Sequence, residues 1–156
     1  MEQYEHCLKL LSEEGVKIDD LVDLVMLLQS QYKPGLTREG CESALVRILN
    51  KREVQHCIMT GICLDRLTHN NALNDVYLQN AIVSDAGLYG IDEVLAYGIC
   101  NLYGSIALTN FGYIDKVKPG IIAKLNNVDH AQACHTFLDD IVGAIVASAA
   151  ASVAHN

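Results

Sequence analysis

Apolar residues recur at intervals of three and four along most of the chain, which is the spacing of an amphipathic helix. Near the N-terminus, Tyr4, Cys7, Leu8 and Leu11 share one such face, and Gly15 closes the pattern. The long stretch 91–110 also has helical length and shows no strand-like alternation. The pattern predicts helices over residues 2–14, 19–32, 38–50, about 51–67, 75–84, 91–110, about 119–126 and 136–154.

The last predicted helix is the most apolar part of the chain, since residues 141–154 carry no charge on any side. A helix of this kind is normally surrounded by other helices. We therefore expect an all-α, multi-helix bundle in which one central apolar helix, about 136–154, is surrounded by the others. Gly143 and Ala147 are small enough to let a neighbouring helix backbone approach closely. A length of 156 residues suits a single domain over 1–156.

The composition narrows the class of protein. With 51% hydrophobic and 19% charged residues, the chain is typical of a globular protein. Its formal net charge of −8 argues against the broad basic surface that binds nucleic acid, so we expect no nucleic-acid partner. The uncharged run 94–114 is interrupted by polar residues and glycines, and the run 141–154 is short. We therefore predict no transmembrane segment.

The N-terminus and the cysteines indicate a cellular location. The segment MEQYEHCLKLL is polar and acidic and does not resemble a signal peptide, which predicts a cytoplasmic protein. The six cysteines form no C-x-x-C pair and are expected to be reduced. A zinc site from His56, Cys57, Cys63 and His69 is conceivable, although their spacing matches no common zinc module. The apolar segment LVDLVMLLQ on so short a chain predicts a homo-oligomer.

Two adjacent acids, Asp139 and Asp140, stand at the head of the predicted central helix. One interpretation is a capping box, in which the Thr136 hydroxyl and the Asp139 carboxylate satisfy each other's backbone N–H groups. Asp140 lies about 100° further round the helix and cannot share that contact. The other interpretation is a cation, because acids enclosed by other helices are costly unless they are paired or bind metal.

Further acids occur in a similar setting. Asp92 and Glu93 begin the uncharged stretch that follows, and Asp115 ends it, three residues before Lys118. The C-terminal half therefore holds three acidic sites, each at the border of an uncharged segment. This pattern favours a Mg²⁺ site built from oxygen ligands, with Lys118 as a positive contact to a phosphate group.

The segments FGYIDKVKPGI and DDIVGAI resemble the C-terminal signature of the phosphatidylglycerophosphatase A family of Mg²⁺-dependent lipid phosphatases. The match carries Asp115, Lys118 and Pro119 from the first motif and Asp139 and Asp140 from the second. An upstream D-E helix start matches less specifically. The segments LYGIDE and HTFLDDIVGAI make the whole chain similar to the soluble branch of that family. The resemblance implies an all-α bundle with one central helix.

The chain departs from the family pattern at several positions. Gly112 stands where the enzymes have Arg, Ile121 stands where a second proline is common, and His135 stands where a glycine often precedes the acid pair. An absent Arg removes a bidentate phosphate ligand that Lys cannot replace. The departures leave metal binding better supported than lipid phosphatase activity.

The resemblance and the acids together predict a Mg²⁺-dependent phosphatase that hydrolyses a phosphate monoester of a glycerophospholipid-type or related small substrate. The alternative is a non-catalytic helical protein of the same fold that binds metal or phosphate for regulation or assembly. His135 would protonate the leaving oxygen, or else it faces solvent at the helix start. The predicted site residues are Asp92, Asp115, Asp139 and Asp140 as Mg²⁺ ligands, Asp140, His135 and Glu93 in catalysis, and Lys118 and Lys51 in phosphate binding.

Overall fold

The computed structural model describes residues 2–155 and contains nine helices and no strand within that range. This confirms the all-α prediction. The helices are α1 (Gln3–Glu13), α2 (Ile18–Gln29), α3 (Arg38–Leu49), α4 (Arg52–His69), α5 (Val76–Val83), α6 (Ile91–Cys100), α7 (Ser105–Val117), α8 (Ile121–Asn126) and α9 (Leu138–His155).

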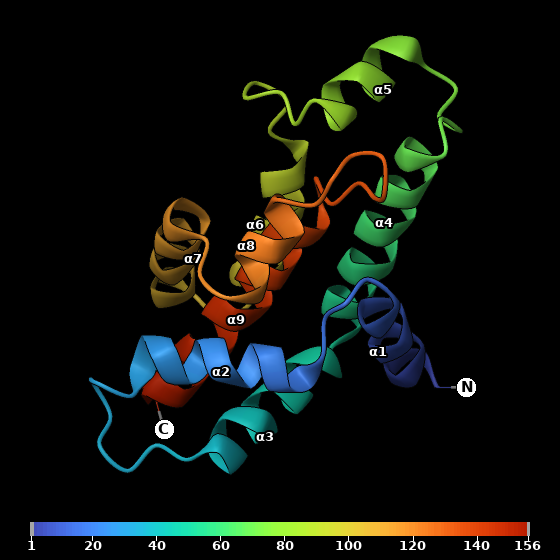
Figure 1. Ribbon diagram of the computed structural model, residues 1–156. Helices are drawn as coiled ribbons and strands as arrows, with labels where there is room; N and C mark the ends of the chain where they lie inside the picture. The colour runs from blue at the N-terminus through green and yellow to red at the C-terminus, as the bar shows by residue number, and fades with distance from the viewer. Residues whose placement is uncertain (1, 156) are drawn as a thin grey trace.

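Helix α9 is the centre of the bundle, as predicted. It packs against α2, α3, α4, α6, α7 and α8, and Figure 1 shows it running through the middle of them. Val142, Ile145, Val146 and Ala149 are fully buried because neighbouring helices cover every side of α9. Helices α1 and α5 lie outside this arrangement and pack on α4. The uncharged run of the sequence is therefore the core of the fold.

Among the described residues, α9 is the one helix long and apolar enough to cross a membrane by length and composition. Within the bundle 83% of it is buried, so its apolar surface is already covered by the other helices.

The expected single helix over 91–110 is wrong. Gly104 has φ +88, a left-handed conformation that ends helical hydrogen bonding and separates α6 from α7. Helix α7 then continues past residue 110, where the pattern predicted no helix, and ends at Val117, before Lys118 with φ +50. Pro119 lies before α8, which begins at Ile121, rather than in its first turn. The break matters because it brings the start of α6 and the end of α7 to the same side of α9.

Two glycines lie where α9 packs against its neighbours. A Cβ atom at Gly143 of α9 would meet side-chain atoms of Phe111 and Ile114 of α7 at 3.4–3.6 Å. A Cβ atom at Gly61 of α4 would lie 2.2 Å from Ile141 Cδ1 of α9. Gly61 is therefore the more tightly packed of the two, although the sequence pointed to Gly143.

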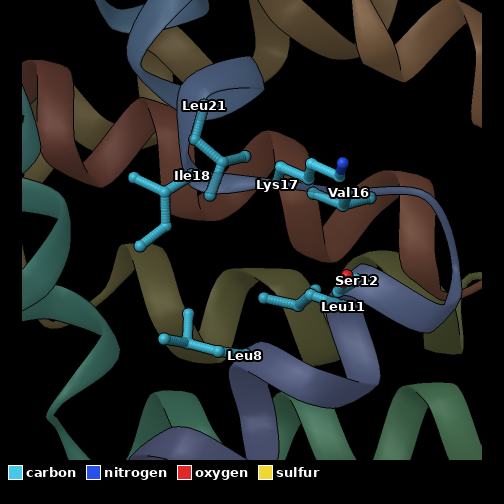
Figure 2. A pocket seen from close by; sticks show the side chains of 7 residues that line it. All are labelled: Leu8, Leu11, Ser12, Val16, Lys17, Ile18 and Leu21. Carbon is cyan, nitrogen blue, oxygen red and sulfur yellow. The ribbon is translucent and has the colours of Figure 1, made fainter.

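A crevice of about 190 Å³ lies at the corner between α1 and α2. Figure 2 shows the side chains that line it. Aliphatic side chains from both helices face one another across it, and no acid lines it. Its lining residues are Leu8, Leu11, Ser12, Val16, Lys17, Ile18 and Leu21. Five of its seven lining residues are aliphatic, so this crevice is mainly an apolar contact between two helices.

Candidate functional site

The predicted acids converge on one pocket of about 270 Å³. It lies where the N-terminal turns of α6 and α9 meet the C-terminal end of α7, beneath the loop 84–90. Six of the predicted residues line it. The complete lining is Asp85, Ala86, Gly87, Gly90, Asp92, Glu93, Asp115, Lys118, Asp139 and Asp140.

The ends of three helices position these side chains. Asp92 and Glu93 occupy the first turn of α6, which begins after Gly90 in a left-handed conformation (φ +71). Asp139 and Asp140 occupy the first turn of α9. The positive ends of the two helix dipoles both point toward the pocket and favour negative charge there. The local sequence thus explains why acids gather at this place.

Lys118 is the only basic side chain that lines the pocket within the described chain. Its Nζ lies 3.2 Å from Asp115 Oδ1 and 3.6 Å from Asp139 Oδ2. Burial acts against its charged form, but the neighbouring Asp139 and Asp115 carboxylates outweigh that effect and raise the pKa of Lys118. One ammonium group therefore faces six carboxyl groups, and most of the negative charge has no counter-charge from the protein.

Asp139 and Asp140 are the most enclosed of these acids, and each is only 5% exposed. The Asp140 carboxyl shares the pocket with the carboxyls of Asp92 and Asp115. Burial raises the pKa of both aspartates, and the proximity of Asp139 and Asp92 raises the pKa of Asp140 further. Such a cluster gains stability from a bound cation, which would favour the charged form of every carboxyl.

The capping box predicted for Thr136 and Asp139 is not formed. The Thr136 hydroxyl donates instead to the Ile82 carbonyl oxygen at 2.6 Å. Asp139 Oδ1 accepts the backbone N–H of its neighbour Asp140 at 2.9 Å. The capping interpretation is therefore wrong, and the acid pair is free to face the pocket.

Asp65 of α4 caps α9 across the bundle. Its two carboxylate oxygens accept the backbone N–H groups of Phe137 and Leu138 at 2.9 and 3.0 Å. Burial raises the pKa of Asp65 to about 7, although the two backbone donors act to lower it. Sequence reasoning missed this residue. The available signal was an acid on the apolar face of α4, in line with Ile58 and Ile62.

Asp85 is the second residue that the sequence did not reveal. It lies in the loop 84–90 with φ +48, directly after the C-cap of α5, where a left-handed residue commonly ends a helix. Burial and the nearby Asp92 raise its pKa. Asp85 also lines a small adjoining hollow together with His130 and Asp139. No local pattern in the sequence marks this position.

His135 and Lys51 do not line the acidic pocket, although His135 lines the adjoining hollow with Asp85 and Asp139. His135 Nε2 is 3.1 Å from Glu14 Oε1, and its Nδ1 is 3.1 Å from the Leu125 carbonyl oxygen, so both ring nitrogens are engaged elsewhere. Lys51 precedes α4, and its Nζ lies over the Tyr103 ring, 5.5 Å from the ring centre. We therefore leave both residues out of the site.

The His135–Glu14 pair predicts a pH-dependent stability. Burial opposes the charged form of His135, but the Glu14 hydrogen bond outweighs it and raises the pKa of His135 above 6.5. The same hydrogen bond, aided by Arg66, lowers the pKa of Glu14 below 4.5. The pair therefore stabilises the fold most between about pH 4.5 and 6.5, and this contribution disappears as the pH rises through the raised pKa of His135.

Urea unfolding across pH 5.5–8.5 tests this expectation. Relative to His135→Gln, the wild type should lose up to about 1 kcal/mol more stability toward the alkaline end, as for a partly screened ion pair. Asp65 also acts on His135 and is present in both proteins, so the difference isolates the imidazole. Parallel profiles for the two proteins would contradict the assignment.

The donor set suits Mg²⁺, because every acidic side chain in the pocket offers oxygen atoms alone. Across residues 2–155, no three His, Cys, Asp or Glu side chains already converge closely enough to coordinate one ion. Mg²⁺ usually keeps several water ligands and takes only one or two carboxylates, so a complete protein ligand set is not required. The residues that could supply such carboxylates are Asp92, Asp115, Asp139 and Asp140.

Comparison with known proteins decides the family. The phosphatidylglycerophosphatase A family profile matches residues 15–155. The chain belongs to the phosphatidylglycerophosphatase A family. The resemblance expected from its motifs is confirmed, and at the level of the family it implies a phosphoric monoester hydrolase.

Relatives of known sequence and structure cover nearly the whole chain. YutG of Bacillus subtilis is 51% identical over 145 residues, which cover 93% of this chain and 86% of YutG. YpjQ of the same organism is 45% identical over 146 residues, which cover 94% of this chain and 81% of YpjQ. Both carry the description of uncharacterized proteins. The crystal structure of low temperature requirement C protein from Listeria monocytogenes superposes with a TM-score of 0.92 at 52% identity, covering 99% of this chain and 96% of that one.

Against the phosphatidylglycerophosphatase A pattern, Gly112 is the departure nearest to the site. It lies on α7 one turn before Asp115 and is exposed, and within the described chain no atom lies within 4 Å of its expected Cβ position. A longer side chain would have room there. The site therefore has a single basic contact, Lys118, at a place where the family pattern supplies two.

Proposed function

We propose that this protein is a Mg²⁺-dependent phosphatase that hydrolyses a phosphate monoester of a glycerophospholipid-type or related small substrate. The observation that carries the proposal is the convergence of six predicted residues, from three helix ends, on one pocket. Membership of the phosphatidylglycerophosphatase A family supports the reaction class.

The charges of the pocket suit a phosphoryl group only when a cation is present. Six carboxyl groups with one lysine repel a phosphate, whereas a divalent cation bridges two negative partners. Bound there, Mg²⁺ would polarise the phosphoryl oxygens and lower the pKa of a water molecule. Asp139, Asp140, Asp115 and Asp92 would hold it.

The protein's own residues then have distinct roles. Lys118 can neutralise a phosphate oxygen, since its Nζ already lies at the pocket between Asp115 and Asp139. Burial, and then the neighbouring Asp115, raise the pKa of Glu93. A carboxylate with a raised pKa is a better base, so Glu93 is suited to take a proton from the attacking water. The water oxygen bonds to phosphorus, the ester P–O bond breaks, and the released alcohol takes up a proton.

The second candidate function is binding of metal or phosphate at the same pocket without hydrolysis. The observation that favours it is Gly112, which leaves Lys118 as the single positively charged side chain in the pocket. In that case the protein would bind metal or phosphate as a regulatory or assembly domain of the same fold.

A phosphate-release assay separates the two functions. With millimolar Mg²⁺ and a panel containing phosphatidylglycerophosphate, glycerol 3-phosphate and other small monoesters, the wild type should release phosphate, and a chelator should stop it. Glu93→Gln should lower kcat by about 10²-fold or more, in the range for loss of a general base. Glu39→Gln, an exposed acid in the first turn of α3, is the matched control. Mg²⁺ binding without any phosphate release would favour the regulatory function.

A further inference from the structure

Exposed apolar side chains are concentrated on one part of the molecule. Within residues 2–155, nine of the fourteen exposed large hydrophobic residues fall between positions 88 and 117. The exposed residues Ile91, Val94 and Tyr97 recur on α6 at helical spacing, and Leu108 is an exposed apolar residue of the next helix, α7. We define the α6–α7 face as Ile91, Val94, Tyr97, Gly98, Leu102 and Leu108.

This face carries no charge. Residues 94–114 contain no Asp, Glu, Lys or Arg, although the chain as a whole has 30 such residues, 11 basic and 19 acidic. Val94 is 59% exposed and Ile91 is 52% exposed, so the bundle leaves much of their apolar surface in water. An apolar surface of this extent is typical of an interaction site.

Contacts within one chain do not explain why glycine occurs at two positions on α6 and α7. Gly98 and Gly112 lie inside helices, where glycine costs about 1 kcal/mol relative to alanine. A Cβ at Gly98 would meet only the Cys57 sulfur, at 4.0 Å, and in the described chain a Cβ at Gly112 would meet nothing within 4 Å. Both positions are exposed, so each leaves room for a second helix to pack closely from outside.

We propose that the α6–α7 face is the interface of a symmetric homodimer, with α6 of one copy packed against α6–α7 of the other. The charges favour a second copy over other occupants. Two chains of net charge −8 repel one another, and the uncharged face is where they can meet with their acids held apart. A charged partner would find no complementary group there.

A membrane surface fits the face less well. Peripheral helices that lie on membranes usually present Lys and Arg beside their apolar residues. Here no basic residue lies between positions 94 and 114, and a net charge of −8 opposes approach to anionic lipid. Most of the segment LVDLVMLLQ, from which a homo-oligomer was predicted, belongs to the monomer core. Leu21, Val22, Leu24 and Val25 are buried, and Leu27 is its one strongly exposed apolar residue in the described structure, at 60%.

Sedimentation velocity at micromolar concentration tests the proposal. The wild type should sediment with twice the 17.0 kDa mass of one chain. Val94→Glu should weaken the dimer by about 10²-fold or more, because a twofold axis places both new carboxylates in one interface. Val76→Glu is the matched control, since Val76 is similarly exposed on α5, and this variant should remain dimeric.

A second variant guards against misfolding. Gly98→Glu places a charge at the centre of the face where the monomer has room for it, and it should also give a monomer with an unchanged circular dichroism spectrum. The proposal is overturned by a wild type that is monomeric at all concentrations, or by dimers that survive both substitutions. A monomeric wild type that binds phosphatidylglycerol vesicles, and loses this binding in Val94→Glu, would show a membrane contact instead.

Discussion

Replacing Asp65 with alanine is expected to destabilise the protein by about 2–4 kcal/mol. The substitution leaves the N–H groups of Phe137 and Leu138 without an acceptor at the buried start of α9. Each unsatisfied buried donor costs about 1–3 kcal/mol, and the helix also loses its cap. Because α9 is the core, the loss should appear as a lower midpoint of a single cooperative transition in urea unfolding.

The matched control is Asp75→Ala. Asp75 caps α5 in the ordinary way, by accepting the N–H of Leu78 within the same helix, and it is exposed to solvent. Its loss should cost about 0.5–2 kcal/mol, since water can replace the carboxylate. If the two substitutions lower the free energy of unfolding equally, the Asp65 cap is no more important for stability than an ordinary exposed helix cap.

Replacing Asp140 with asparagine is expected to change the response to metal more than it changes the fold. Without a divalent ion the variant should be as stable as the wild type or more stable, because repulsion from Asp139, Asp92 and Asp115 is removed. With Mg²⁺ at a hundredfold excess over its Kd, the wild type should gain about 2.7 kcal/mol and the variant should gain none. Thermal unfolding of both proteins, with and without millimolar Mg²⁺, measures the two effects.

Asp19→Asn provides the control for charge alone. Its side chain is 92% exposed on α2, far along the chain from the pocket, and the variant should keep the full Mg²⁺ response. If Asp140→Asn is stabilised by Mg²⁺ as much as the wild type, the pocket is not the metal site.

The sequence revealed the core of the fold because the central helix has no charge over fourteen positions, from Ile141 to Ala154. It did not reveal the break between α6 and α7. A single residue, Gly104, makes that break inside an uncharged run, and glycine occurs both within helices and at their ends. The segment after it forms a helix because Ala107, Phe111 and Ile114 pack in the core, a tertiary effect outweighing the local pattern.

The acids of the site were recognisable because each borders an uncharged segment, and helices that pack around one centre bring such borders together. The residues that hold the start of α9 in place were not recognisable from the sequence. Asp65 bonds to a residue 72 positions away, and Thr136 bonds to one 54 positions away, so the local capping pattern was misleading. His135 was expected at the start of the last helix, facing either the substrate or solvent, but α9 begins at Leu138 and the imidazole contacts Glu14 at the end of α1 instead.

The most direct test of the central claim is anomalous diffraction from crystals grown with Mn²⁺, a Mg²⁺ substitute that prefers the same oxygen ligands. The account predicts one anomalous peak in the pocket, coordinated by carboxylates from the set Asp92, Asp115, Asp139 and Asp140. A peak at any other place, or a pocket without a peak at millimolar Mn²⁺, would contradict it.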